Sequence, residues 1–182
     1  MQFDRYFNKL TLENAGKWGS IEATRDVYNF TDARTAYNLA KQNGWPFHWH
    51  VLVWGNQQPA WIEALPPEEQ LEEIKELWAL IAQEFPDIDI LEVVNEPLHD
   101  APFGATNGNY GDALGGRAPE SEYGQWTWIV NAFKLARAQF PNAQLMLNDY
   151  SISNDGNATT RYLEIINLLK SMELIDIIGD QG

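Results

Sequence analysis

The sequence predicts an α/β fold, a parallel barrel of the TIM (β/α)8 type. Strand-like and helix-like segments alternate along the chain, with no linker or low-complexity segment between them, and such alternation indicates a parallel sheet. The expected strands end in polar residues, namely Glu13-Asn14, His50, Asn95-Glu96, Asn148-Asp149 and Gln181. Polar strand ends are typical of the catalytic face of a barrel, whereas an open doubly wound sheet gathers its site at one switch point.

In the first half of the chain, capping residues and hydrophobic spacing define the elements. Thr31-Asp32 can cap a helix that Gly44 ends. The segment 66–69 places proline and acidic residues in a first helical turn, which suits the helix dipole. We therefore expect strands at about 7–12 and 46–54, and helices at about 31–43 and 66–85.

In the second half, a β-prone apolar run starts at Ile88 and leads to Glu96. Pro97 ends this strand because proline removes a ladder donor. A long glycine-rich loop is expected to follow over residues 98–119. Beyond it we expect helices at about 121–139 and 158–172, and strands at about 143–148 and 175–179.

The composition limits the class of protein and its partners. The 182 residues are enough for one domain with a sizeable core, and we expect a single domain over residues 1–182. A net charge of −14 argues against nucleic acid or an anionic membrane as a partner and favours a neutral substrate. The chain has no cysteine, which excludes a disulfide framework and a thiolate metal site. No stretch is apolar enough to span a bilayer, and the N-terminus lacks a signal core.

Glu96 is the strongest candidate for chemistry. It stands with Asn95 at the C-terminal tip of an expected buried strand. Partial desolvation there can raise the pKa of a carboxyl group, so that it donates a proton near neutral pH. The alternative is a strand-end glutamate that faces water, and this residue alone does not decide between the two.

A second candidate segment precedes the first expected helix. Glu13, Asn14 and Lys17 could together bind several hydroxyl groups of a sugar. The i,i+3 spacing of Asn14 and Lys17 also fits an ordinary capped helix start.

The expected strand at 46–54 carries a third set. Its residues His48, His50, Leu52 and Trp54 share one face, because side chains alternate along a strand. His50 could hold a hydroxyl or a carboxylate, or be a satisfied core histidine. Trp54 could form the floor of a sugar pocket or simply pack. The amide of Gln57, on the following loop, suits sugar contacts.

The three histidines raise the question of a metal. His48, His50 and His99 include an H-x-H pattern, but no further ligand follows at a set spacing. We therefore expect neither a catalytic metal nor a cofactor.

Taken together, several motifs resemble glycoside hydrolase family 10, the endo-β-1,4-xylanases. They occur in the family's order across nearly the whole chain. They are Glu13-Asn14-x-x-Lys17-Trp18, His50-x-Leu52-Val53-Trp54, Gln57-Gln58-Pro59-x-Trp61, Val93-Val94-Asn95-Glu96, Asn148-Asp149-Tyr150 and Ile178-Gly179-x-Gln181. Related barrel glycosidases such as family 5 cellulases share Asn-Glu-Pro, so the first two motifs make the resemblance specific.

The resemblance implies retaining hydrolysis of internal β-1,4 bonds in xylan, with xylan and xylo-oligosaccharides as partners. Glu96 would be the general acid/base, and Asn95 would bind the sugar next to the scissile bond. Tyr150 would stack on the aglycone side, and Asn148 and Gln181 would support the catalytic carboxylates. The glycone subsites would be lined by Glu13, Asn14, Lys17, His50, Trp54 and Gln57.

The sequence also departs from the family's pattern. Gly55 stands where a histidine is usual, Trp49 replaces a usual glycine, and Pro97 replaces a common alanine. The nucleophilic glutamate of the family lies on the seventh strand in a Thr-Glu-x-Asp-like run, and no such run occurs here. We therefore expect an incomplete barrel with about strands 2 to 6 present and bare edge strands, poorly stable and with little or no activity by itself.

Other functions remain open at this point. The chain could belong to another barrel β-glycanase such as a cellulase, or be a non-catalytic carbohydrate-binding remnant. It could also be a truncated product that neither folds nor binds. By the resemblance, the protein is expected to act outside the cell, although no signal peptide is visible.

Overall fold

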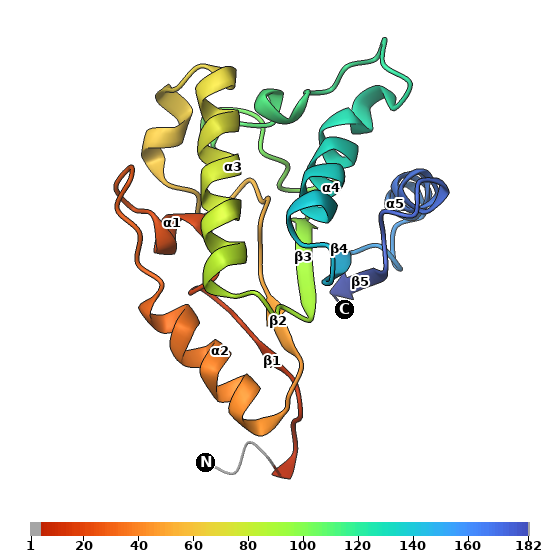
Figure 1. The fold of residues 1–182 in the computed structure, drawn as a ribbon. Coiled ribbons are helices and arrows are strands. Elements are labelled where there is room, and N and C mark those ends of the chain that lie inside the picture. Colours follow the sequence, from red (N-terminus) through yellow and green to blue (C-terminus); the bar gives the residue numbers. More distant parts are fainter. Residues whose placement is uncertain (1–4, 182) are drawn as a thin grey trace.

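The computed structural model describes residues 5–181 as one five-stranded parallel sheet with the strand order β1-β2-β3-β4-β5. Every neighbouring pair is parallel, so the chain runs from strand to helix to the next strand, as in a barrel. The strands are β1 (Leu10–Thr11), β2 (Phe47–Trp49), β3 (Ile90–Asn95), β4 (Gln144–Tyr150) and β5 (Ile177–Gln181). The molecule is a partial α/β barrel (Figure 1), which confirms the predicted fold class.

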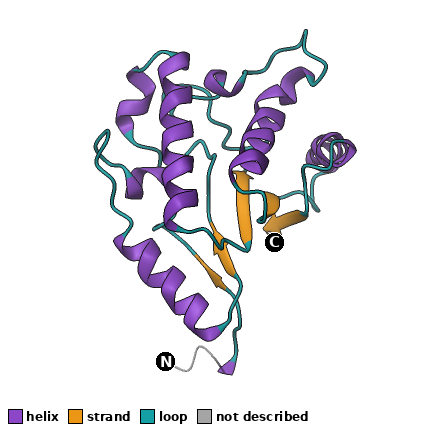
Figure 2. Cartoon of the chain, in the orientation of Figure 1, coloured by secondary structure: helices purple, strands orange, loops and turns teal. Residues whose placement is uncertain are grey.

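The helices flank this row of strands (Figure 2). They are α1 (Trp18–Ile21), α2 (Thr31–Asn43), α3 (Pro67–Glu84), α4 (Thr127–Gln139) and α5 (Gly156–Ser171), with short 3₁₀ helices η2 (Ala60–Ala64), η3 (Asp112–Leu114) and η4 (Gly124–Trp126). The four longer α-helices were predicted, and Gly44 ends α2 in the left-handed conformation as expected. No helix within residues 5–181 has the length and apolar character needed to cross a bilayer.

Several boundaries differ from the prediction, most clearly at the first two strands and at α4. The strand predicted over 7–12 is confined to Leu10–Thr11. The strand predicted over 46–54 ends at Trp49, although the backbone N–H groups of Leu52 and Val53 still bond to carbonyls of β3. The helix predicted from 121 begins at Thr127, because Gly124 adopts a φ of 53° that an α-helix cannot contain. Residues 121–123 form a turn instead, and the 3₁₀ helix η4 follows it.

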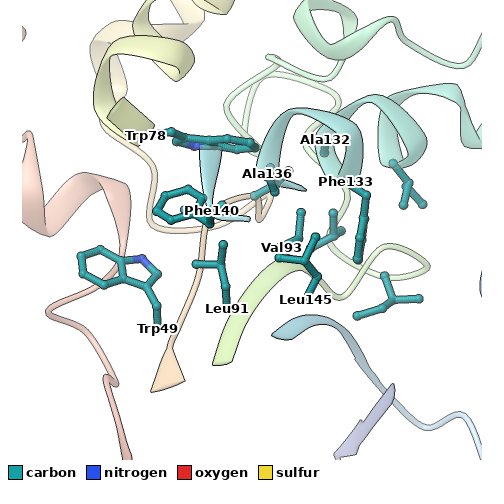
Figure 3. Close-up of a cluster of buried hydrophobic side chains, with 14 of the residues drawn as sticks. Trp49, Trp78, Leu91, Val93, Ala132, Phe133, Ala136, Phe140 and Leu145 are labelled. Atoms are coloured by element: carbon teal, nitrogen blue, oxygen red, sulfur yellow. The ribbon is translucent and has the colours of Figure 1, made fainter. Parts of the chain in front are cut away.

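The apolar side of the sheet packs under the helices. Figure 3 shows Leu91, Val93 and Leu145 on the strands facing Phe133 and Ala136 of α4. On β2, Phe47 and Trp49 on one face and His48 on the other are all buried, as the prediction of a strand buried on both faces requires. This packing leaves the opposite face of the sheet to the polar residues.

A bulge in β3 explains how its polar residues come to share that face. The pairing with β4 shifts between Glu92 and Val94. One extra residue resets the alternation of side chains, so Glu92 and Asn95, three positions apart, both line the same cavity. Strict alternation along the strand would have separated them.

Candidate active site

A cavity of about 530 Å³ lies on the polar face of the sheet. Seven of the predicted site residues line it, namely Glu13, His50, Trp54, Asn95, Glu96, Asn148 and Gln181. The cavity thus gathers residues from the regions of all five strands, as expected for the carboxyl end of a barrel. Its volume is in the range of small-molecule binding sites.

Glu96 lies directly after β3 in a constrained position. Its φ of 54° is left-handed, which is uncommon for a residue with a side chain and is often found at functional sites. Its backbone N–H bonds to the carbonyl of Asn148 at 2.8 Å. The side chain accepts hydrogen bonds from Trp54 Nε1 at 2.6 Å and from Gln181 Nε2 at 3.2 Å. Two neighbouring elements therefore hold its carboxyl group in one orientation.

The pKa of Glu96 is raised above the ordinary value of a carboxyl group. Burial is the largest cause, since the residue is only 8% exposed, and the hydrogen bond that the protonated group donates to Asp100 also raises the pKa. The hydrogen bonds from Gln181 and Trp54 act in the opposite direction, but they do not outweigh burial. A carboxyl group of this kind can hold and release a proton closer to neutral pH.

Glu92, which sequence reasoning missed, is the second buried carboxylate of the cavity. It is 1% exposed, and its Oε2 lies 2.9 Å from His50 Nδ1 and 3.3 Å from His48 Nε2. Burial alone would raise its pKa, but the hydrogen bonds and charges of the two histidines lower the pKa to about 2. A charged residue inside an apolar strand run is the signal that could have revealed it.

Side-chain amides connect the two glutamates. Asn148 Nδ2 donates to Glu92 Oε1 at 3.2 Å and to Asn95 Oδ1 at 3.1 Å. Gln181 Nε2 donates to the same Asn95 oxygen at 3.0 Å and also to Glu96. The network fixes the orientation of the Asn95 amide, with its oxygen accepting two bonds.

The remaining predicted residues, namely Asn14, Lys17, Gln57 and Tyr150, do not line the cavity. Lys17 Nζ donates to Asn14 Oδ1 at 2.9 Å and lies 4.9 Å from the ring centre of Trp54, so this pair adjoins the cavity. Tyr150 stacks on His99, with ring centres 4.0 Å apart. Gln57 is exposed and has a φ of 55°.

Tyr110 and Gly55 show why the loop after Glu96 closes on Trp54. The buried hydroxyl of Tyr110 donates to the carbonyl of Trp54 at 2.6 Å and accepts from its N–H at 2.9 Å. The N–H of Gly55 donates to the carbonyl of Asp100 at 2.7 Å. A Cβ on Gly55 would lie 2.4 Å from that oxygen, so the histidine usual in the family has no room here. Sequence reasoning missed Tyr110, which carries no motif.

The three histidines do not gather at one point. His48 and His50 both face Glu92, whereas His99 Nδ1 lies 2.7 Å from Asp149 Oδ1. Each histidine therefore has a carboxylate partner from the protein itself.

A parallel half-barrel whose strand ends carry a positioned, high-pKa glutamate defines the class of the barrel glycosidases. Consistent with this, the model of glycosyl hydrolase family 10 matches residues 1–182. The chain belongs to this family, which confirms the resemblance seen in its motifs.

Individual relatives agree with the family assignment. The chain is 36% identical to endo-1,4-beta-xylanase B of Cellvibrio japonicus, over 99% of this chain and 27% of the relative. Among solved structures, it resembles native xylanase 10B from Thermotoga maritima with a TM-score of 0.76 and 35% identity, over 97% of this chain and 52% of the other. Xylanase 10B from Thermotoga petrophila, in complex with xylobiose, gives 31% identity and a TM-score of 0.76, over 97% and 52%. The chain thus spans about half the length of these structures.

Proposed function

We propose that this chain is the acid/base half of a retaining endo-1,4-β-xylanase that cleaves internal bonds of xylan. The observation that carries the proposal is the Glu96 carboxyl group, buried at the end of β3 with a raised pKa and held by Trp54 and Gln181. Family membership and the xylobiose complex of a relative support xylan as the substrate class. The negative charge of the chain fits a neutral polysaccharide.

In the first step of this mechanism, Glu96 donates its proton to the glycosidic oxygen as the bond to the anomeric carbon breaks. A nucleophilic carboxylate attacks that carbon and forms a covalent glycosyl-enzyme. In the second step, the Glu96 carboxylate takes a proton from water, and the water oxygen displaces the enzyme from the sugar. The raised pKa suits both steps, because the same group must be an acid and then a base.

The other cavity residues would bind the sugar on either side of the broken bond. Asn95, next to Glu96, would hold the sugar adjoining the scissile bond, while Asn148 and Gln181 would keep the carboxyl groups in place. Tyr150 would stack on the aglycone side. The glycone side would be formed by Glu13, Asn14, Lys17, His50, Trp54 and Gln57.

The nucleophile is the part of the mechanism that we do not assign to this chain. Retaining enzymes place their two carboxyl groups about 5–5.5 Å apart. Glu92, the other buried carboxylate of β3, is already held by two histidines. We therefore expect the nucleophile on a part of the barrel that the relatives have and this chain lacks, and little or no hydrolysis by the 182 residues alone.

The test is Glu96→Gln in a protein that joins this sequence to the rest of its barrel. The rate of xylan hydrolysis should fall by about 10²–10⁴-fold. For an aryl xyloside whose leaving group needs no proton, the rate of the first step should fall far less. Glu72→Gln on α3, with a side chain 72% exposed, is the matched control and should keep full activity. An undiminished rate on xylan in the Glu96 variant would refute the role.

Binding measurements on the 182-residue chain distinguish the proposed xylanase from a non-catalytic carbohydrate-binding remnant. Xylotriose binding that is unaltered by Glu96→Gln, together with an inactive complete barrel, would favour a binding remnant. Faster hydrolysis of cellulose than of xylan by the complete barrel would favour another β-glycanase. If the proposal is right, the protein acts outside the cell, where its polymer is found.

A further inference from the structure

Three acidic side chains meet away from the cavity, between the segment after α1 and helix α3, two elements that lie side by side in Figure 1. Glu22, Asp26 and Glu73 each place one carboxylate oxygen within 4.8 Å of those of the other two. None of the three lines the cavity that holds Glu96. The cluster is therefore a separate feature of the molecule.

Two of these three carboxyl groups are deeply buried. Glu22 is 0% exposed and Glu73 is 6% exposed, whereas Asp26 faces solvent. Glu22 accepts hydrogen bonds from Trp18 Nε1 at 2.8 Å and from the N–H of Asp26 at 2.9 Å. Buried acidic groups that lie this close together call for compensating positive charge.

Arg25 supplies only part of the compensating positive charge, because it contacts one of the two carboxylate oxygens of Glu73. Its Nε donates to Glu73 Oε1 at 2.8 Å, its Nη2 contacts the same oxygen, and Nη2 also reaches Glu69. The second oxygen of Glu73, Oε2, is buried and has no hydrogen-bond partner among residues 5–181. A buried carboxylate oxygen that has lost its water and gained no partner is unfavourable.

We propose that Glu22, Asp26 and Glu73 form a binding site for Ca²⁺, with Glu73 Oε2 as one of its ligands. Two oxygens bound to the same Ca²⁺ can lie at most about 5 Å apart, twice the metal–oxygen distance, so carboxylates within 4.8 Å of one another suit this ion. The three carboxylates carry more negative charge than the one guanidinium, which Glu69 also shares, can offset, and a divalent cation would neutralise the excess.

The ligand chemistry favours Ca²⁺ over other common cations. All three groups offer carboxylate oxygens, the hard ligands of Ca²⁺, whereas Zn²⁺ prefers nitrogen and sulfur. Mg²⁺ demands near-ideal octahedral geometry and keeps most of its water. The exposed Asp26 leaves an entry path for the ion and room for water to complete the coordination.

The bound ion would connect the glycone side of the cavity to helix α3. Glu22 follows Trp18 by one helical turn, and Trp18 packs edge-on against Tyr110 at 5.5 Å and Trp61 at 5.9 Å. Tyr110 in turn holds the backbone of Trp54. Calcium should therefore stabilise the packing around Trp18 and Tyr110 without taking part in xylan hydrolysis.

The test measures the melting of the whole chain with its metal controlled. The protein is stripped with EDTA, kept at constant ionic strength, and melted with calcium chloride, with magnesium chloride or with neither. We expect one Ca²⁺ bound per chain in equilibrium dialysis and a Tm rise of about 5–10 °C when free calcium is a hundredfold above Kd. Magnesium should give a much smaller rise.

Glu73→Gln should abolish the calcium-dependent rise in Tm. The matched control is Glu69→Gln, which alters the other partner of Arg25 on the same helix and should keep the rise. If the Glu73 variant does not melt cooperatively, Asp26→Asn replaces it, and this exposed substitution should weaken calcium binding about tenfold. Retention of full calcium binding by the variant that folds would overturn the proposal.

Two further results would also overturn it. Equal Tm shifts with calcium and magnesium would show general screening of an acidic protein rather than a site. A Tm that rises on acidification but does not respond to calcium would mean that Glu22 and Glu73 share a proton instead.

Discussion

Glu92 lies within β3 and Glu96 directly follows this strand. Both residues are buried, yet their pKa values move in opposite directions. The pKa of Glu92 is lowered to about 2, whereas that of Glu96 is raised. The difference lies in their partners. Glu92 meets two histidines that carry charge when protonated, whereas Glu96 meets a neutral indole and a neutral amide.

This comparison shows that burial alone does not decide whether the pKa of a carboxyl group is raised. For both residues desolvation is the largest influence and favours the protonated form. The two histidines reverse that preference at Glu92 and make it a fixed anion. The neutral hydrogen bonds at Glu96 orient the carboxyl group but leave burial in control of its pKa.

The largest expected effect comes from the same substitution made at each glutamate. At pH 5.5, Glu92→Gln should lower the free energy of unfolding by about 3–4 kcal/mol, because it leaves the buried His48 and the partly buried His50 without their anion. Glu96→Gln should change it by less than about 0.5 kcal/mol, since the amide keeps the shape and removes a disfavoured charge. Urea unfolding of the two variants checks this, and similar losses for both would break the comparison.

The next effect is a dependence of stability on pH that differs in sign between the two residues. The folded pKa of Glu92 lies below its unfolded value, so its contribution is present above about pH 4.5 and is lost as pH falls towards 2. A shift from 4.5 to about 2 corresponds to about 3 kcal/mol.

Glu96 acts in the opposite sense, because its folded pKa is raised. Its contribution is present below about pH 4.5 and is lost as pH rises through the folded pKa. Unfolding should be measured from pH 2 to 8 in both variants. In Glu92→Gln, the decrease in the free energy of unfolding at low pH should disappear. In Glu96→Gln, the decrease at higher pH should become smaller. Parallel curves for both variants would contradict the assignment.

The comparison also shows what the sequence could and could not predict. Glu96 could be predicted as a site residue, because an Asn-Glu pair at the tip of an apolar strand is a local sequence pattern. The alternation of strands and helices similarly predicted the sheet and its order. Both depend on neighbours in the sequence, where periodicity and capping operate.

Glu92 was missed because its role depends on the tertiary structure. It is explained by His48 and His50 on the adjacent strand, and by a bulge that brings it onto the same face as Asn95. Strict alternation also failed on β2, where the strand stops at Trp49 and Leu52 does not line the cavity. Tyr110 lies in a glycine-rich loop without periodicity, so only the folded chain shows that it holds Trp54.

A smaller effect on stability is expected from Gly55→Ala, which disturbs the loop after Glu96 and leaves the surroundings of Glu92 unchanged. The new Cβ would lie 2.4 Å from the carbonyl oxygen of Asp100, so the loop after Glu96 must move, at a cost of about 2–3 kcal/mol. Gly156→Ala is the control, because a Cβ there meets nothing within 4 Å, and its Tm should be unchanged or slightly higher. Equal Tm values for the two variants would mean that the loop does not close on Gly55.

The smallest effect should come from Tyr110→Phe, which tests how firmly Trp54 holds Glu96. Loss of the hydroxyl leaves the buried N–H and carbonyl of Trp54 without this partner, which should destabilise the chain by about 1.5 kcal/mol. As Trp54 shifts, its bond to Glu96 weakens. That bond lowers the Glu96 pKa, so its loss should raise the pKa further, as measured by carbon-13 titration of the carboxyl group.

The matched control is Tyr162→Phe, which removes a buried hydroxyl that bonds to the carbonyls of Leu147 and Gly179 instead. It should cost similar stability while leaving the Glu96 titration unmoved, and a shift of the same size in both variants would show that general loosening, rather than Trp54, sets the pKa.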